Sequence, residues 1–269
     1  MPTSNAKPQN LKIVFFTNKT RHGAELLNGM RNNDIIVDAI FIEKPSTQEY
    51  LEKFKKNLKK YGVTKTIKKI IIKLKHILRR QNKAKWLIDD FYSFYSKNVH
   101  VLDDLNGEQC ERLLHKIRPG VIVLGGTRII SKKIIKIPTR GILNAHPGLL
   151  PKYRGVDVIP WAIYNGDEIG VTVHFIDEGV DTGGIIKRRT IKIERNDTIN
   201  SLKRKAEILA GEMISDTIIE IDSNREIHVA YQSKSDGRQY YKMPRKVLRE
   251  TKRRLNEIRS GIRNDNKLL

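Results

Sequence analysis

Three side chains whose types suit acyl transfer lie within residues 141–184. Asn144 and His146 alternate in an extended stretch that ends at Pro147, so both side chains should project to the same side. Asp181 follows in a glycine-rich turn after a second apolar stretch. An amide can donate to a developing oxyanion, an imidazole can donate to the same oxygen or move a proton, and a carboxylate can raise that imidazole's pKa. This set predicts acyl transfer to an amine without a covalent enzyme intermediate.

Other residues were considered for a nucleophile or a metal site. No serine or cysteine stands beside His146, and the single cysteine, Cys110, falls in a predicted helix. His174 lies inside an apolar stretch and is expected to be a hydrogen-bonded core histidine. A metal site of His146, His174 and Asp181 is conceivable by residue type, but no further ligands accompany it, so no metal is expected. The other histidines form no recognisable group: His22, His76, His100, His115 and His228.

Two longer motifs surround the candidate catalytic residues. Residues 144–155 read Asn-Ala-His-Pro-Gly-Leu-Leu-Pro-Lys-Tyr-Arg-Gly, and residues 173–184 read Val-His-Phe-Ile-Asp-Glu-Gly-Val-Asp-Thr-Gly-Gly. Together they resemble the folate-dependent formyltransferase family, which includes glycinamide ribonucleotide, methionyl-tRNA and sugar N-formyltransferases. The likeness is dense over 121–193 and weaker over 11–42.

The resemblance implies roles for individual residues. Asn144, His146 and Asp181 would be the catalytic set, and the formyl donor would be 10-formyltetrahydrofolate. Two loops would hold this folate. The first comprises Thr127, Arg128, Ile129 and Ile130; the second comprises Ile176, Asp177, Glu178, Gly179 and Val180.

The elements around these motifs alternate between strand and helix. Apolar runs predict strands at 11–16, 37–42, 99–101, 121–124, around Leu143, at 171–176 and at 185–193. Helical spacing predicts helices over about 24–30, 107–117 and 198–220. Near-continuous apolar strands separated by helices favour an α/β protein with a Rossmann-like, mostly parallel sheet and helices on both faces.

Charge divides the chain into a body and two basic attachments. The net charge is +22, of which residues 51–98 carry +12 and residues 241–269 carry +7. We therefore predict a catalytic domain over 11–220 with a basic helical insertion at about 47–98, followed by a short C-terminal extension over 221–269 with a basic tail. The basic charge of the insertion would be explained equally well by lysines that face solvent on amphipathic helices and by binding of a partner. Its aromatic residues are expected to make core or dimer contacts.

The sequence defines the molecule that receives the formyl group less well than it defines the formyl donor. Residues 17–23 lack the Gly-Asn-Gly-Ser type of phosphate loop, and the 49 residues after Glu220 do not suit the C-terminal barrel of the methionyl-tRNA enzymes. These observations favour a small amine, such as an amino sugar or another phosphorylated amine, and an anionic one suits the basic exterior. Methionyl-tRNA and glycinamide ribonucleotide are the alternatives. A non-catalytic RNA- or membrane-surface-binding protein on the same fold is a further one.

The remaining features concern compartment and partners. A single cysteine fits a reducing environment, and neither a signal peptide nor a run of 18 apolar residues is evident, so a cytoplasmic protein without a transmembrane segment is expected. Nucleic-acid binding through the basic segments is conceivable but not favoured. A homodimer is left open.

Overall fold

The computed structural model describes residues 10–44 and 91–265. They form a seven-stranded sheet in the order β3-β2-β1-β4-β5-β7-β8, in which the first five strands are parallel and β7 and β8 alternate in direction. The strands are β1 (Ile13–Thr17), β2 (Ala39–Glu43), β3 (Val99–Leu102), β4 (Val121–Gly125), β5 (Gly141–His146), β7 (Ile169–Phe175) and β8 (Ile185–Ile191). The predicted mostly parallel sheet is confirmed.

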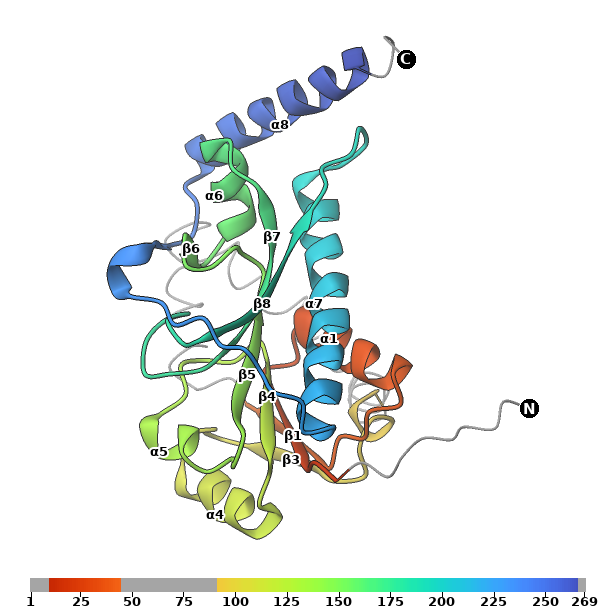
Figure 1. The fold of residues 1–269 in the computed structure, drawn as a ribbon, viewed down its shortest axis with the longest axis vertical. Helices are drawn as coiled ribbons and strands as arrows, with labels where there is room; N and C mark the ends of the chain where they lie inside the picture. The colour runs from red at the N-terminus through yellow and green to blue at the C-terminus, as the bar shows by residue number, and fades with distance from the viewer. Residues whose placement is uncertain (1–9, 45–90, 266–269) are drawn as a thin grey trace, which may run out of the picture.

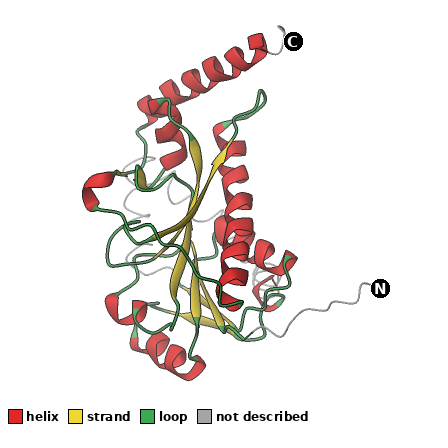
Figure 2. Cartoon of the chain, in the orientation of Figure 1, coloured by secondary structure: helices red, strands yellow, loops and turns green. Residues whose placement is uncertain are grey.

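Helices cover both faces of this sheet, as Figures 1 and 2 show. Successive side chains of β1 point to opposite faces, so Phe15 packs toward one group of helices and Phe16 toward the other. One group is α1 (Arg21–Asn32) and α7 (Ile199–Asp222); the other is α4 (Glu108–Ile117) and α5 (Lys132–Ile135). Because both faces are buried, the central strands are apolar throughout, and this produced the continuous runs in the sequence.

Helices α1 and α7 lie against each other at two glycines. A Cβ atom on Gly29 would lie 2.5 Å from the carbonyl oxygen of Gly211. Any side chain there would separate the helices, because that distance is far shorter than van der Waals contact. The two backbones can therefore touch, and α1 is held over the carboxyl end of the parallel strands.

A second, two-stranded sheet lies beside the end of β5. β6 (Tyr153–Gly155) pairs in parallel with β9 (Arg238–Tyr240), which follows the 3₁₀ turn η1 (Lys234–Asp236). This pairing returns the segment after α7 to the loop that follows β5. The C-terminal extension is thus joined to the catalytic core.

The chain ends in a long basic helix. α8 (Arg245–Asp265) packs against α6 (Val158–Asn165) through Thr251 and Leu255, both buried, and extends away from the sheet in Figure 1. Part of the basic tail expected in the C-terminal extension is therefore helical. No helix in the described parts of the chain is long and apolar enough to cross a membrane.

Most of the predicted basic insertion lies outside the described residues. Its last part, 91–98, is described. There Tyr92 is buried in the core and Phe91 and Tyr95 pack against the same cluster, as expected of core aromatics. Phe94 is exposed, and the Arg31 guanidinium lies over its ring, 3.7 Å from the centroid.

Candidate active site

The candidate catalytic residues meet at the carboxyl end of β5. The strand order reverses between β1 and β4, and a crevice forms outside the strand ends at such a point in open α/β sheets. Asn144 and His146 occupy alternate positions of β5 beside this point, and β7 pairs Asn144 with His174 in antiparallel register. The structure brings Asn144, His146, His174 and Asp181 together.

His146 is buried and has contacts at both ring nitrogens. Nε2 lies 2.7 Å from the Tyr153 carbonyl oxygen, which can only accept, so this nitrogen carries a proton. Nδ1 lies 3.4 Å from Oδ2 of Asp181. A proton arriving at Nδ1 would therefore point at a carboxylate.

Burial lowers the pKa of His146 below its usual 6.5, and the attraction of Asp181 offsets only part of this effect. Asp181 raises the imidazole's pKa, as the sequence predicted, but burial lowers it by more. The physical reason is the cost of desolvating the charged ring. At neutral pH the ring is a neutral base with Nδ1 free to take a proton.

Asp181 reaches the site from the turn between β7 and β8. Its backbone has a φ of 53°, a left-handed conformation that Asp tolerates better than most residues. Oδ2 accepts a hydrogen bond from the Gly155 backbone N–H at 2.8 Å. Burial opposes ionisation, but the neighbouring His146 and His174 rings and this N–H outweigh it and lower the pKa of Asp181 to about 2. The carboxylate is charged at any physiological pH.

His174 is fully buried and hydrogen-bonded, as predicted, but it also belongs to the site. Its Nδ1 lies 2.7 Å from the Phe175 carbonyl oxygen and must donate to it, which leaves Nε2 as an acceptor. Nε2 accepts from Nδ2 of Asn144 at 3.2 Å and lies 3.6 Å from Oδ1 of Asp181. This contact uses one amide hydrogen of Asn144 and leaves the other available. The sequence carried no signal for it, because strand register is set by tertiary pairing.

His22 also lies at the site, although the sequence gave no group for it. It stands in the first turn of α1, hydrogen-bonds the Ala145 backbone and interacts electrostatically with His146. Burial lowers the pKa of His22 to about 4, and the attraction of Glu207 only partly opposes this. A second neutral imidazole therefore stands beside His146 at neutral pH. Only the packing of α1 over the end of β5 could show this.

The first predicted folate loop follows β4. Ile129 is exposed, whereas Ile130 is buried in the core between the sheet and α4, so only its backbone can face a ligand. Arg128 pairs with Glu43, whose side chain is 2% exposed, at 2.9 Å, and the hydroxyl of Thr127 donates to the Arg128 carbonyl oxygen. The guanidinium of Arg128 thus anchors the loop to β2.

The second predicted folate loop lies beside the first. Ile176 packs on the same core cluster, and its N–H donates to the Ile142 carbonyl oxygen at 2.8 Å. Asp177 caps the turn by accepting from Gly179 N–H at 3.0 Å, and Val180 is half-buried. Glu178 pairs with Lys132 at the start of α5 at 2.7 Å, which links the two loops. An exposed ion pair therefore connects the two loops near the candidate catalytic residues.

The cluster of histidines and Asp181 was also compared with the geometry of a metal site. Although His146, His174 and Asp181 lie together, no group of three or more histidine, cysteine, aspartate or glutamate residues in the described ranges is arranged to hold a metal ion. Cys110 is buried in α4, and burial raises the pKa of its thiol to about 12. It is therefore an inert core residue.

The fold and the site define a Rossmann-like α/β protein with an amide, an imidazole and a carboxylate at the end of its central sheet. The chain belongs to the formyl transferase family, whose model, described as "Formyl transferase", matches residues 11–218. This membership confirms the resemblance drawn from the two motifs.

Two curated relatives are methionyl-tRNA formyltransferases. The chain is 35% identical over 150 residues to a methionyl-tRNA formyltransferase of Halothermothrix orenii, covering 54% of this chain and 46% of that protein. It is 44% identical over 98 residues to that of Thermodesulfovibrio yellowstonii, covering 36% of this chain and 32% of that protein. The chain thus spans less than half the length of these curated relatives.

Solved structures share the fold at low sequence identity. Glycinamide ribonucleotide transformylase 1 of Symbiobacterium toebii has a TM-score of 0.56 at 18% identity, covering 84% of this chain and 96% of its own. A 4-N formyltransferase of Francisella tularensis has a TM-score of 0.55 at 17% identity, covering 92% of this chain and 88% of its own. These likenesses establish the fold and leave the acceptor open.

Proposed function

We propose that this protein transfers a formyl group from 10-formyltetrahydrofolate to the amino group of a small acceptor. The observation that carries the proposal is the cluster at the end of β5, where Asn144 contacts His174 at 3.2 Å and Asp181 lies 3.4 Å from His146 and 3.6 Å from His174. The proposed acceptor is an amino sugar or another phosphorylated amine. Methionyl-tRNA and glycinamide ribonucleotide are the alternatives.

Asn144, oriented by the ring of His174, would stabilise charge on the formyl oxygen. When the amine nitrogen attacks the formyl carbon, a C–N bond forms and the carbonyl oxygen becomes an oxyanion. The Asn144 amide is held by His174 at 3.2 Å, so its second N–H has a fixed direction from which to donate to that oxygen. A preoriented donor needs no reorganisation at the moment of reaction, which is the source of its catalytic effect.

His146 and Asp181 would move the proton. The attacking amine must lose a proton as the new bond forms, and N10 of the folate must gain one as the bond between it and the formyl carbon breaks. Nδ1 of neutral His146 can accept the first, directly or through one water, and ionised Asp181 at 3.4 Å stabilises the resulting imidazolium. The same proton then passes to N10, so the enzyme returns to its starting state.

The two loops would hold the folate beside this cluster. Exposed Ile129 offers an apolar surface, the Lys132–Glu178 pair joins the loops, and the Arg128–Glu43 pair ties the first loop to the sheet. A rigid wall with a few polar groups and exposed backbone suits a flat heterocycle such as a pterin.

Two observations bear on the acceptor, and they favour different molecules. The relatives from Halothermothrix orenii and Thermodesulfovibrio yellowstonii are methionyl-tRNA formyltransferases. Yet the segment after α7 pairs with β6 as β9 and continues as α8, and both elements pack on the catalytic core. This arrangement favours a compact acceptor over one that needs a separate binding domain in this region.

A panel of acceptors tests the proposal. The protein is incubated with 10-formyltetrahydrofolate and, separately, nucleotide-linked amino sugars, glycinamide ribonucleotide and methionyl-tRNA, and formylated product is measured by mass spectrometry. We expect product with a small anionic amine and none with the His146→Ala variant. If product forms with methionyl-tRNA alone, the acceptor is methionyl-tRNA and not a small amine. No product with any acceptor, together with salt-dependent binding of RNA or anionic vesicles, would favour the non-catalytic alternative.

A further inference from the structure

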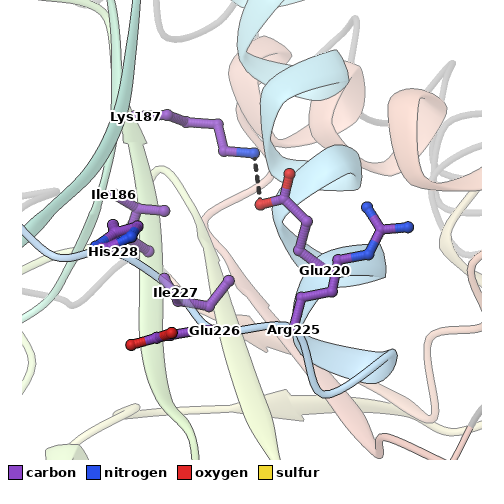
Figure 3. Close-up of a pocket in the computed structure, with 7 residues that line it drawn as sticks. All are labelled: Ile186, Lys187, Glu220, Arg225, Glu226, Ile227 and His228. Carbon is purple, nitrogen blue, oxygen red and sulfur yellow. Dashed lines mark hydrogen bonds and ion pairs between the residues drawn. The ribbon is translucent and has the colours of Figure 1, made fainter.

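Two pockets outside the catalytic cluster differ in how their charges are arranged. The pocket in Figure 3, of about 290 Å³, lies between β8 and the end of α7. It is lined by both signs of charge, and Lys187 pairs with Glu220 across it at 2.8 Å. Because its charges neutralise one another, this pocket has no preference for a ligand of either sign.

The other pocket, of about 340 Å³, lies between α6, β9 and the start of α8, and we call it the α6–β9 pocket. Its volume falls in the range of pockets that bind small molecules. Four aromatic rings and two cations dominate its lining: Trp161, Tyr164, Tyr240, Tyr241, Arg238 and Lys242.

The aromatic wall is fixed by contacts behind it. Trp161 Nε1 donates to the Tyr241 carbonyl oxygen at 2.9 Å, and the rings of Trp161 and Tyr240 lie 5.4 Å apart. Tyr240 in turn stacks on buried Tyr153 with centroids 5.1 Å apart. Tyr241 is 70% exposed and presents its ring to solvent. A planar ligand could therefore stack here without rearranging the wall.

The cations at this pocket have no carboxylate partner. Neither Arg238 nor Lys242 is within ion-pair distance of an acidic side chain in the part of the chain that the structure describes. The nearby carboxylates are already engaged, since Asp167 pairs with Lys152 and Asp157 with Lys203, at 2.8 and 2.9 Å. Asp157 attracts Lys242 from beyond ion-pair distance, and the Arg238 guanidinium lies over the Tyr240 ring, 5.6 Å from its centroid. The pocket therefore presents two cations without a close ion pair beside flat aromatic rings.

We propose that the α6–β9 pocket binds a nucleoside phosphate. The base stacks on the wall formed by Trp161 and Tyr241, and the phosphate pairs with Arg238 and Lys242. Stacking between bases and aromatic side chains, combined with cations on the phosphate, is the usual basis of sequence-independent nucleotide binding. The pocket holds one nucleotide, free or as part of a small molecule, because it encloses one stacking site rather than a row of them.

This site is separate from the catalytic cluster. Tyr153 lies between them, since its ring stacks on Tyr240 while its carbonyl oxygen bonds His146. Tyr153 is 1% exposed and so closes the α6–β9 pocket from the site behind it. The proposal therefore does not depend on formyl transfer and is tested without folate.

Calorimetric titration of the full chain with UMP and AMP, and separately with uridine and inorganic phosphate, tests the site. We expect saturable binding of a nucleotide at one site per chain, with uridine and phosphate each at least tenfold weaker. Tyr241→Ala should weaken nucleotide binding about tenfold, and Arg238→Gln/Lys242→Gln should do so more strongly and remove most of its salt dependence. All three side chains are exposed enough to be replaced without loss of core packing.

Two control variants distinguish this site from a general effect of surface charge and from the catalytic crevice. Arg112→Gln/Lys116→Gln removes two exposed charges from α4, at the other end of the molecule in Figure 1, and should leave binding unchanged. Asn144→Ala alters the catalytic cluster and should also leave it unchanged. Loss of nucleotide binding in Asn144→Ala but not in Tyr241→Ala overturns the proposal, because the nucleotide then sits in the catalytic crevice. Binding of hexauridylate with no binding of UMP or AMP also overturns it, in favour of RNA.

Discussion

The imidazole of His174 orients the amide of Asn144. Its Nε2 accepts from Asn144 Nδ2 at 3.2 Å, and its Nδ1 is held by the Phe175 carbonyl oxygen at 2.7 Å. The two residues face each other across the antiparallel β5–β7 pair. A buried core histidine thus fixes the direction of the group that we propose to stabilise the oxyanion.

Replacing His174 by phenylalanine should lower kcat about tenfold with little change in the KM for the formyl donor. The substitution fills the same buried space but removes the acceptor, and one lost neutral hydrogen bond corresponds to roughly 1 kcal/mol. Steady-state kinetics of both substrates would measure this. His174→Gln, which restores an acceptor, should recover part of the loss. Equal kcat in His174→Phe and wild type would show that the contact has no positioning role.

His146→Ala and Asp181→Asn should each lower kcat roughly 100- to 1000-fold while the protein stays folded. Both residues act on charge that develops during the reaction, and single electrostatic contacts of that kind have effects of this size. Single-turnover formylation, with circular dichroism as the control for folding, measures the change. Turnover near the wild-type rate in either variant would rule out the proposed proton path.

His22 should make the protein less stable in mild acid. Its folded-state pKa, about 4, lies below the ordinary value of 6.5, so the unfolded chain binds the proton first. The stability that depends on the neutral ring is present above pH 6.5 and is lost as the pH falls from 6.5 toward 4. The loss of urea midpoint between pH 7.5 and 5.0 should therefore be smaller in His22→Gln than in wild type. His115→Gln, at an exposed position, should behave as wild type, and identical losses in all three proteins would contradict the assignment.

Ile129 and Ile130 should respond differently to substitution. Ile129→Ala removes an exposed apolar surface and should weaken binding of a folate analogue with no change in unfolding, because the side chain is 65% exposed. Ile130→Ala should instead cost stability of about 2–5 kcal/mol, as expected for a buried isoleucine. Calorimetry with the analogue and urea unfolding would separate the two. Unchanged affinity in Ile129→Ala would remove this loop from the proposed folate site.

Replacing one partner of the Arg128–Glu43 ion pair should lower stability more than replacing both partners. Arg128→Gln leaves the buried Glu43 carboxylate with only the Leu105 N–H at 3.1 Å, so stability should fall by about 1–3 kcal/mol. Glu43→Gln in the same chain removes the stranded charge and should restore much of the loss. Urea unfolding of the two single variants and the double variant tests this. If the stability losses of the two single variants simply add in the double variant, Arg128 and Glu43 do not stabilise each other.

The sequence was most informative where a single local rule decides the outcome. Continuous apolar runs predicted the buried strands of a parallel sheet, because both of its faces are covered. The alternation of Asn144 and His146 predicted that their side chains share a side, because a strand has a period of two.

Tertiary structure decided every contact between distant segments. The sequence identified His174 as a core histidine and left His22 without a group, but the register of β7 against β5 and the placement of α1 brought both to the site. Burial outweighs the effect of Asp181 on the His146 pKa, and the Arg128 guanidinium pairs with Glu43 in another strand. Side-chain type and local spacing are properties of the chain itself. Strand register, desolvation and ion pairing depend on which surfaces meet, and only the folded molecule determines that.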